Sequence, residues 1–532
     1  MDHLKSNFNT NSRAAKENRQ EMLALLEQLN KYKAESLFQG KEHQIARARK
    51  RGKLLARERI ELVLDEDSPF LELMPFVGLK GKGFGAGGTS VCGIGLVQGK
   101  LCMVNSNVGT RKGGSVDYAT MTKSMRGNDI AMENKLPSIN LVESGGANLP
   151  DQARCFNIGG RSFKDITNRS KYNLSTISVV FGNATAGGAY VPGMSDYAIF
   201  QKESAKVFLA GPPLVKMATN EVSTAEELGG AAMHSRVSGV SDYLAEDELD
   251  GIKIARNIMR HVKVTTSHFE PKEEILEPLY DAEEILSVVP ANTKTPFDIR
   301  ELIMRIVDGS EFSEFKPEYG STLVTGWTKI HGYPVGIIGN NGVIFSESAN
   351  KGAQFIQLCN KNDIPLLFIH NTTGYMVGKD YEEGGIIKNG AKLINAVSNS
   401  EVPHLTLMVG NSYGAGNYGM NGRSYNPRFL FTYPNAKVGV MGGEQLAGVM
   451  EIVQRGSAKA KGVEFDEEKG AMMKQMLIHD AESKATAWFS SSELWDDGVI
   501  DPRETRSYMG FALAIVYNQA IKGTETYGVW RH

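Results

Sequence analysis

The sequence predicts an α/β protein built from two similar halves. Short apolar runs rich in valine and isoleucine alternate with stretches of helical periodicity, a pattern typical of βαβ units. Two different motifs also recur at one constant spacing along the 532 residues, which indicates an internal duplication. Glycine is abundant, at 57 residues, and its clusters mark places where the backbone turns tightly or approaches a ligand.

The predicted strands are uncharged apolar runs, which are typical of strands buried on both faces of a sheet. They span residues 101–104, 138–142 and 177–181 in the first half and 335–338, 366–369 and 405–409 in the second. The predicted helices between them span residues 118–134, 348–361 and 384–398. The first 50 residues predict a helical arm, because one helix face carries Met22, Leu23, Leu25, Leu26 and Leu29.

The duplication is visible in two motif pairs. LPSINLVESGGA begins at Leu136 and its counterpart IPLLFIHNTTGY at Ile364. ISVVFGNATAGGAY begins at Ile177 and its counterpart LTLMVGNSYGAGNY at Leu405, so both pairs share one offset along the chain. A charged stretch with several prolines, residues 271–296, is typical of a linker. We therefore expect an arm over residues 1–50, an N-terminal domain over 51–275 and a C-terminal domain over 276–532.

Composition excludes several classes of function. The formal net charge of −2 gives no bulk reason to expect nucleic acid or a membrane as a partner. No run approaches the roughly 18 apolar residues of a membrane span, and the N-terminus has no apolar signal core. We therefore expect a cytoplasmic protein, with the mitochondrial matrix as the alternative. The four cysteines lack CxxC spacing, so we expect reduced thiols and no metal in this chain.

Glycine-rich turns follow the predicted strands in both halves. Such turns leave backbone N–H groups unpaired, as does the start of a helix. Two N–H groups that converge on one point form an oxyanion hole, which would stabilise an acyl-thioester enolate. Tight turning and close helix–sheet packing would also explain one isolated glycine pair, and the spacing fits neither common phosphate-binding loop. The matched turns in both halves favour two oxyanion holes, as a transfer between two substrates requires.

Longer motifs resemble the carboxyltransferase (β) subunits of biotin-dependent acyl-CoA carboxylases. The first half contains SGGANLP (144–150), ATAGGAYVPGMSDY (184–197), FLAGPPLVK (208–216) and ELGGAAMHSRVSGVSDY (227–243). The second contains NTTGYMVGKDYEEGGIIKNGAKLINAVSN (371–399) and SYGAGNYGMNGRSYNPRFLFTYPNAKVGVMGG (412–443). The resemblance runs from about Arg51 to the C-terminus. It implies two tandem crotonase-like (ClpP/crotonase ββα-spiral) domains, an N-terminal carboxyltransferase domain for acyl-CoA and a C-terminal one for carboxybiotin.

The resemblance also implies the site residues. As catalytic donors it implies Gly187 and Gly188 for the thioester oxygen, and Ala415 and Gly416 for the biotin ureido oxygen. The acyl-CoA residues are then Gly145, Gly146, Ala147, Lys112, Ser162, Phe163 and Tyr190, and the biotin residues are Gly374, Tyr375, Tyr413 and Gly414. The small side chain of Ser162 would leave room for a longer acyl chain. The charged run of Lys379, Asp380, Glu382 and Glu383 is either a solvated face or part of the biotin site.

By the same resemblance the carboxyl group passes from carboxybiotin to an acyl-CoA without a side-chain base. Four histidines without a partner motif are therefore predicted to be structural: His234, His331, His370 and His404. No biotin-attachment tetrapeptide, ATP-grasp segment or P-loop is visible. Biotin and the ATP chemistry are thus expected on a biotin carboxylase/biotin carboxyl carrier α subunit. The family further implies a homo-hexamer of two trimers, with each site shared between facing halves of two subunits.

ESGGANL and GGAYVPGMSDY favour the methylcrotonyl-CoA and geranyl-CoA carboxylase branch of these ligases. The expected substrate is a branched or medium-to-long α,β-unsaturated acyl-CoA. The alternatives are the β subunit of an acetyl- or propionyl-CoA carboxylase, the carboxyltransferase of a biotin-dependent acyl-CoA decarboxylase, and an inactive scaffold that keeps only the fold.

Overall fold

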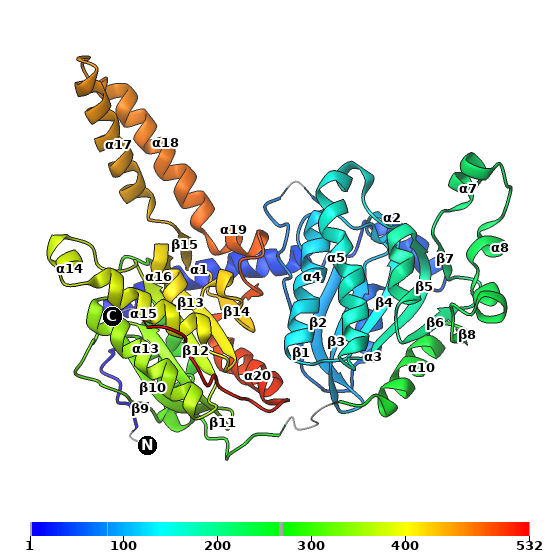
Figure 1. Cartoon of the computed structure of the whole chain (residues 1–532), viewed down its shortest axis with the longest axis horizontal. Coiled ribbons are helices and arrows are strands. Elements are labelled where there is room, and N and C mark those ends of the chain that lie inside the picture. Colours follow the sequence, from blue (N-terminus) through cyan, green and yellow to red (C-terminus); the bar gives the residue numbers. More distant parts are fainter. Residues whose placement is uncertain (1–2, 82, 265–269, 531–532) are drawn as a thin grey trace. The chain divides into compact units, whose positions relative to one another are not determined.

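The computed structural model describes residues 3–81, 83–264 and 270–530. The chain divides into two compact units (Figure 1). One comprises Tyr32–Phe269, and the other comprises Met1–Lys31 with Glu270–His532. We refer to them as the first and second units. The predicted boundaries after residues 50 and 275 stay a prediction, and residues 1–2, 265–269 and 531–532 of the predicted arm and domains lie outside the described residues.

The two units contain sheets of the same topology. The order is β1-β2-β3-β4-β5-β6-β8, with β7 beside β5, and β16-β14-β13-β12-β11-β10-β9, with β15 beside β13. In each sheet only the first three strands pair antiparallel, so the rest is the parallel sheet expected of βαβ units. The strands are β1 Phe70–Glu72, β2 Ser90–Val97, β3 Lys100–Asn107, β4 Ser138–Ser144, β5 Thr176–Thr185, β6 Tyr197–Gln201, β7 Lys206–Phe208, β8 Tyr243–Ala245, β9 Ser313–Glu314, β10 Leu323–Ile330, β11 Tyr333–Asn340, β12 Leu366–Thr372, β13 His404–Tyr413, β14 Phe429–Thr432, β15 Lys437–Gly439 and β16 Gly498–Val499.

The helices of the first unit connect these strands. They are α2 Glu42–Lys50, α3 Ala56–Val63, η1 Lys112–Gly114, α4 Tyr118–Glu133, η2 Leu149–Asp151, α5 Gln152–Lys171, η3 Ala186–Ala189, α6 Tyr190–Gly193, α7 Pro212–Thr219, α8 Ala225–Gly229, α9 Ala231–Met233, η4 His234–Ser238 and α10 Glu248–His261. The α4 helix begins where predicted, because the Asp117 carboxylate accepts the Thr120 N–H as an N-cap.

The helices of the second unit repeat the pattern. They are η5 Ala282–Glu284, α11 Ile285–Val288, α12 Ile299–Ile303, η6 Asp308–Ser310, α13 Ser346–Lys361, α14 Lys379–Glu383, α15 Ile386–Asn399, α16 Gly414–Gly419, η7 Arg423–Tyr425, α17 Gly443–Ala460, α18 Glu467–Ala485, α19 Ala487–Ser492, η8 Pro502–Glu504 and α20 Thr505–Tyr517. α1 Arg13–Ser36 crosses the division between the units. The predicted alternation of strands and helices is confirmed in both halves.

The duplication extends to the hairpin that opens each sheet. Residues 98–99 between β2 and β3 and residues 331–332 between β10 and β11 all have positive φ, as a two-residue type I′ hairpin requires. The Asp65 carboxylate accepts both N–H groups of the first turn, and Asp308 those of the second. The acidic residue of each half therefore fixes a turn.

Each sheet buries an apolar face under helices. In the first unit α3 and α10 cover one face, and the core contains Ile60, Val63, Ile139, Val179 and Ile252. In the second unit α13 and α15 pack against β10 and β12, and the core contains Leu323, Ala353, Phe355, Phe368 and Leu393. These cores position the carboxyl ends of the central strands, where the glycine-rich turns lie.

The start of the chain packs on the second unit. The Ser6 hydroxyl donates to Glu301 at 2.7 Å, and the Arg19 guanidinium pairs with Glu283 at 2.7 Å. Of the five residues predicted on the apolar face of α1, Met22, Leu26 and Leu29 are buried, whereas Leu25 is half-buried and Leu23 is exposed. Most of the arm thus belongs to the compact unit formed by the C-terminal half of the chain.

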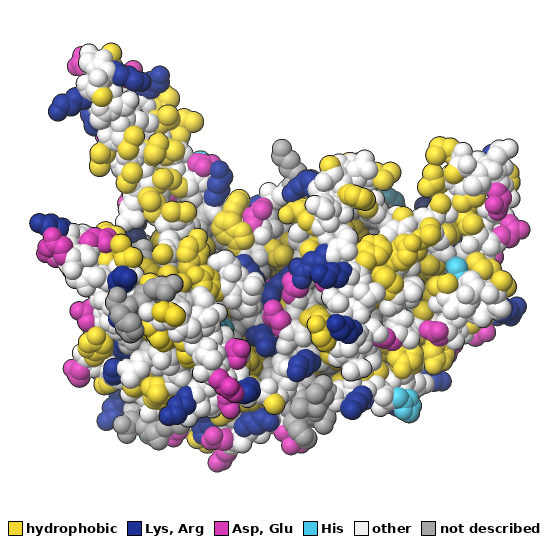
Figure 2. Space-filling view, in the orientation of Figure 1, with side chains coloured by type: hydrophobic (Ala, Val, Ile, Leu, Met, Phe, Trp, Pro, Cys, Tyr) yellow, Lys and Arg dark blue, Asp and Glu magenta, His cyan; other side chains and the backbone are white. Residues whose placement is uncertain are grey.

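An insertion distinguishes the two halves. α7 and α8 lie between β7 and β8, whereas the corresponding place between β15 and β16 holds the longer α17 and α18, which form a helical hairpin (Figure 1). Many of its apolar side chains are exposed (Figure 2): Val449, Ile452, Val453, Met472, Met473 and Met476. None of the described helices combines the length and hydropathy needed to span a bilayer.

Candidate active site

The β4 turn of the first unit uses most of its backbone donors internally. The Gly146 N–H bonds to the Ser144 hydroxyl at 3.2 Å, and the Gly145 N–H to the Gly113 carbonyl at 2.9 Å. Gly146 has φ +86°, which only glycine adopts easily. The Val116 N–H donates to the Gly146 carbonyl, and the Val116 carbonyl accepts the Asn148 N–H. The Ala147 N–H, which lies between these two bonds, has no hydrogen-bond partner among the described residues.

The second turn of this unit starts η3, directly after β5. Ala186 has φ +54°, unusual for a residue with a Cβ. In a 3₁₀-helix that begins at Ala186, i→i+3 bonding leaves the Gly187 N–H without a partner inside the helix. The same pattern pairs the Gly188 N–H with the Thr185 carbonyl. Gly187 is exposed, so its free donor faces open space.

The second unit repeats this geometry. The Gly374 N–H donates to the Thr372 hydroxyl at 3.2 Å. The Ile344 N–H donates to the Gly374 carbonyl and the Ile344 carbonyl accepts the Met376 N–H, so these two bonds lie on either side of the Tyr375 N–H. Gly414, the counterpart of Ala186 in the repeat, has φ +56° and opens α16. The first-turn N–H groups of α16, which include those of Ala415 and Gly416, have no partner inside the helix.

Gly416 is also needed for packing. A Cβ there would lie 2.8 Å from the Gly374 Cα, so the two turns of this unit touch. A Cβ at Gly188 would meet no heavy atom closer than 4.0 Å, and one at Gly187 would lie 3.6 Å from the Phe163 ring. Packing within the chain therefore does not require small residues at positions 187 and 188.

The predicted acyl-CoA residues gather beside Gly187 from α5 and α6. Phe163 packs edge-on against Tyr190, with ring centroids 5.1 Å apart. Ser162, one residue earlier, donates to the Gly159 carbonyl inside α5 at 2.6 Å. The wall nearest Gly187 is thus Phe163. Lys112 is exposed in η1, 5.9 Å from the Phe84 ring centre.

The predicted biotin residues differ in how their side chains point. The Tyr375 ring lies between α15 and α16, because Cβ atoms at Gly390 and Gly419 would meet it, and burial raises its pKa. Only its backbone is then available to a ligand. Tyr413 ends β13, and burial raises its pKa to about 12. The charged run forms the exposed helix α14, in which Lys379 pairs with Glu383 at 3.7 Å.

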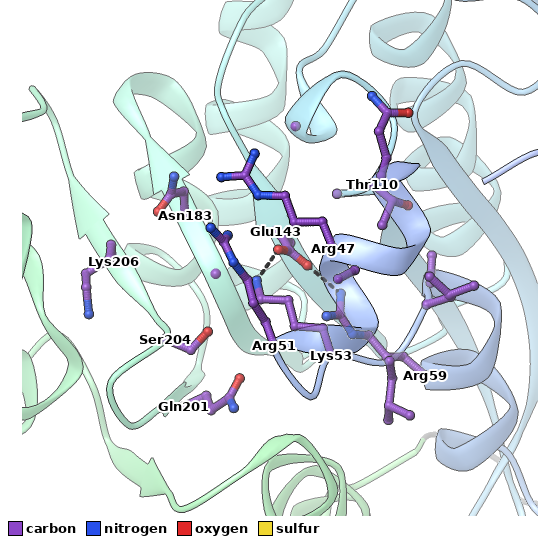
Figure 3. Close-up of a pocket in the computed structure, with 18 of the residues that line it drawn as sticks. Arg47, Arg51, Lys53, Arg59, Thr110, Glu143, Asn183, Gln201, Ser204 and Lys206 are labelled. Carbon is purple, nitrogen blue, oxygen red and sulfur yellow. Dashed lines mark hydrogen bonds and ion pairs between the residues drawn. The ribbon is translucent and has the colours of Figure 1, made fainter. Parts of the chain in front are cut away.

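A cationic cavity of about 900 Å³ lies at the carboxyl ends of β4 and β5 in the first unit. Figure 3 shows Arg47 and Arg51 extending over Glu143, with Asn183 and Lys206 on the opposite side. Arg47 and Arg51 are exposed, and neither has an ion pair with a described residue. Two unpaired guanidinium groups in one cavity are suited to a phosphate-bearing ligand.

Glu143 anchors the floor of this cavity. Its carboxylate pairs with Lys53 and, at 2.9 Å, with the buried Arg59. Arg59 also holds Glu248 at 2.7 Å. Burial raises the pKa of Glu143, but Arg59 and Lys53 lower it more, so it lies below its ordinary 4.5 and the group is ionised at neutral pH. Cβ atoms at Gly109 and Gly182 would both collide with Glu143, which ties these glycines to its position.

The four candidate histidines are engaged in structural contacts. His234 bonds to Ser238 and to the Val207 carbonyl, both at 2.7 Å. His404 bonds to Ser400 at 2.8 Å, and burial lowers its pKa to about 4. Burial likewise lowers the pKa of His331. Within residues 3–81, 83–264 and 270–530, no three His, Cys, Asp or Glu side chains are grouped to hold a metal ion.

One feature was missed at the sequence level. The cationic cavity combines Arg47 and Arg51 with Lys53, and the signal was the basic run from Arg47 to Lys53, which includes five cationic side chains. His370, which the sequence predicted to be structural, bonds to the Ser412 hydroxyl and to the Met420 carbonyl beside α16.

The chain is similar to known proteins over nearly its full length. Residues 47–527 match the family model described as "Carboxyl transferase domain". A probable biotin-dependent acyl-coenzyme A carboxylase beta2 subunit of Mycobacterium tuberculosis is 53% identical, with 99% of this chain and 100% of the relative covered. A probable mitochondrial methylcrotonoyl-CoA carboxylase beta chain of Drosophila melanogaster is 46% identical, with 99% and 95% covered. The crystal structure of the geranyl-CoA carboxylase beta subunit of P. aeruginosa is 42% identical, with a TM-score of 0.89 and 100% of both chains covered.

Proposed function

Because this chain belongs to the carboxyl transferase domain family, we propose that its two pairs of glycine-rich turns are the two oxyanion holes of carboxyl transfer. The protein is the carboxyltransferase β subunit of a biotin-dependent acyl-CoA carboxylase, and the predicted crotonase-like fold is that of its family. The observation that supports the proposal is the matched geometry of the turns. In each unit, free backbone donors follow two neighbouring parallel strands, at positions related by the constant offset of the repeat.

In the first unit, the N–H groups of Gly187 and Ala147 would hold the thioester oxygen of acyl-CoA as negative charge develops on it. Gly188, which the resemblance implied as the second donor, is not included because its N–H pairs with the Thr185 carbonyl in η3. In the second, the N–H groups at the matched positions, Tyr375 and Ala415, would hold the ureido oxygen of biotin, with that of Gly416 beside them. Carboxybiotin, carried by a partner subunit, supplies the carboxyl group. The residues fit such a ligand, since Gly414 and Ala415 leave the α16 donors uncovered and Ala415 is exposed. Backbone donors need no reorganisation when charge appears, which is their advantage over flexible side chains.

The cationic cavity would take the phosphate end of CoA. It reaches Gly113, whose carbonyl accepts the Gly145 N–H beside the acyl site. Arg47 and Arg51 are free to bind phosphate, whereas Lys53 is neutralised by Glu143. CoA would therefore run from this cavity toward Gly187, and Lys112 is a further candidate contact.

Replacing Arg51 with alanine should raise the KM for the CoA ester about tenfold and leave kcat unchanged, because phosphate binding is equal in ground and transition states. Steady-state kinetics with CoA and 3′-dephospho-CoA esters would measure it. Arg49→Ala is the matched control, since Arg49 lies two residues before Arg51, is paired with Glu58 on α3 and does not line the cavity. An unchanged KM in Arg51→Ala would refute the assignment of the cavity.

The acyl substrate we propose is a short branched, α,β-unsaturated acyl-CoA. Phe163 supports the shorter chain, because its ring stands 3.6 Å from where a Gly187 Cβ would be. The prediction from Ser162 of a longer chain has no support from its position, because its hydroxyl faces the helix backbone.

Phe163→Ala should shift the preference in kcat/KM toward longer acyl chains by about tenfold, since each methylene accommodated is worth about 1–3 kcal/mol. Ser162→Ala, its neighbour on α5, should leave the preference as in the wild type. Competition between methylcrotonyl-CoA and geranyl-CoA would measure the chain-length preference of each variant. The pocket assignment fails if the two variants behave alike.

The function itself is tested by purifying the chain with its biotinylated partner and measuring ATP-dependent bicarbonate fixation. We expect fixation on methylcrotonyl-CoA to exceed that on acetyl- and propionyl-CoA. Equal rates on all esters would contradict the proposed branch. Recovery of a partner without an ATP-grasp domain would favour the decarboxylase alternative.

The assembly and location are also proposals. The exposed apolar side chains of α17 and α18 support association of this chain with further protein (Figure 2). We propose a homo-hexamer bound to a biotin-carrying α subunit, and the mass in solution measures this. A cytoplasmic location, with the mitochondrial matrix as the alternative, stays a prediction.

A further inference from the structure

A buried polar network lies beneath α16 in the second unit. His370 on β12 bonds through Nδ1 to the Ser412 hydroxyl on β13 at 2.8 Å. Its Nε2 bonds to the Met420 carbonyl just after α16 at 2.5 Å. The Asn417 side-chain amide on α16 donates to the same Ser412 hydroxyl at 2.8 Å. His370 and Ser412 are fully buried.

The Met420 carbonyl and the Asn417 amide, at the two ends of this network, fix the direction of every hydrogen bond in it. The Met420 carbonyl can only accept, so His370 Nε2 carries the proton and donates. Nδ1 then accepts the Ser412 O–H, and the Ser412 oxygen accepts the Asn417 amide. Burial lowers the pKa of His370 to about 4, so the ring is neutral and this arrangement persists at neutral pH.

The network connects both ends of α16 to the sheet. Ser412 lies two residues before Gly414, where the helix begins, and Met420 follows Gly419, where it ends. One imidazole therefore connects the two ends of a six-residue helix. Asn417 adds a third attachment in its middle.

The other half of the protein holds its equivalent turn without this network. There the Ser195 hydroxyl donates to the Val191 carbonyl of α6 and lies 2.8 Å from the Ser178 hydroxyl on β5. At the offset that relates Leu136 to Ile364, the counterparts of His370, Ser412 and Asn417 are Val142, Ala184 and Ala189. These three lie in one apolar cluster of the first unit. The fold therefore does not require the histidine-centred network, in which one side chain connects both ends of the helix, and its presence on the biotin side needs a functional reason.

We propose that His370, Ser412 and Asn417 are positioning residues that aim the α16 backbone donors at the ureido oxygen of biotin. The proposal rests on the function proposed above. Displacing a reacting group by about 1 Å can cost about 100-fold in rate, and a short helix without anchors would move by such amounts. The fixed hydrogen bonds keep the donors preorganised.

The test replaces the network with the packing of the other half, in the triple variant His370→Val, Ser412→Ala, Asn417→Ala. We expect the Kd for free biotin, measured by NMR titration, to rise at least about tenfold, with a parallel loss in transfer rate. The Kd for the CoA ester should not change. If the triple variant fails to fold, Asn417→Ala alone, on the half-buried side of α16, should weaken biotin binding about threefold.

Thr325→Val is the matched control, because it also removes a buried hydrogen bond from the second unit. The Thr325 hydroxyl donates to the Phe315 carbonyl and does not belong to the network beneath α16. It should keep wild-type biotin affinity. Folded variants that bind biotin like the wild type would overturn the positioning role, as would an equal loss in Thr325→Val. A wild-type protein that binds no biotin would instead contradict the proposed function.

Discussion

Replacing Ala415 with proline is expected to stop carboxyl transfer while the second unit stays folded. Proline removes the Ala415 N–H, which has no partner inside α16, and proline is tolerated in the first turn of a helix. The preceding residue is Gly414, which has no Cβ to clash with the proline ring. The ring would also occupy the space where the ureido oxygen is expected.

The rate of transfer should fall about 10²–10³-fold, which corresponds to about 2.7–4 kcal/mol for one oxyanion-hole donor. Ala415→Ser, which retains the N–H, is the control and should remain within a fewfold of wild type. Assays of transfer between free biotin and the CoA ester, together with thermal unfolding, would separate the two effects. Retained transfer in a folded Ala415→Pro protein would mean that this donor does not act on biotin.

Arg59→Leu should cause the greatest loss of stability among single substitutions in the first unit. The Arg59 guanidinium is 1% exposed, lies 4.5 Å from the Phe181 ring centre and pairs with Glu248 and Glu143. Its removal leaves two carboxylates without their main counter-charge, which costs about 3–5 kcal/mol for a buried pair. The Tm of this unit should fall by on the order of 10 °C. Because Glu143 immediately precedes Ser144, the acyl-CoA turn should loosen as well.

Calorimetry would measure this change against Arg49→Leu, whose ion pair with Glu58 is partly exposed and should contribute about 1 kcal/mol or less. Equal shifts in the two variants would refute the central role of Arg59. The pH dependence follows from Glu143. Its folded-state pKa lies below its ordinary 4.5, so its contribution is present above that value and is lost as the pH falls through the folded-state pKa. The difference between Arg59→Leu and the wild type should therefore shrink in acid.

The sequence alone was sufficient for the fold class, the duplication and the position of each glycine-rich turn. These are local properties. Strand burial is recorded in runs of apolar residues, and a position with positive φ, such as Gly146 or Gly414, favours glycine regardless of its distant neighbours. Because both halves encode the same local rules, the offset that relates β4 to β12 also relates β5 to β13.

Side-chain direction was harder to predict, because adjacent residues on a helix or turn point to different surroundings. Ser162 and Phe163 are neighbours in sequence, yet only Phe163 faces Gly187. Tyr375 occupies a turn that the sequence located, but its ring is enclosed by α15 and α16. Each step of one residue along a helix rotates the side chain by about 100°, so neighbouring residues face different surroundings.

Tertiary structure decided which residues from distant parts of the chain meet. Arg59 reaches Glu143 and Glu248 across 84 and 189 residues, and His370 reaches Met420 across 50. Such pairs depend on the packing of separate elements to within a few tenths of an ångström, and no local pattern records it. The sequence by itself determined where the two pairs of turns lie and that they match. The three-dimensional packing decided that His370, Ser412 and Asn417 join in one hydrogen-bonded network, whereas their counterparts Val142, Ala184 and Ala189 pack in an apolar cluster.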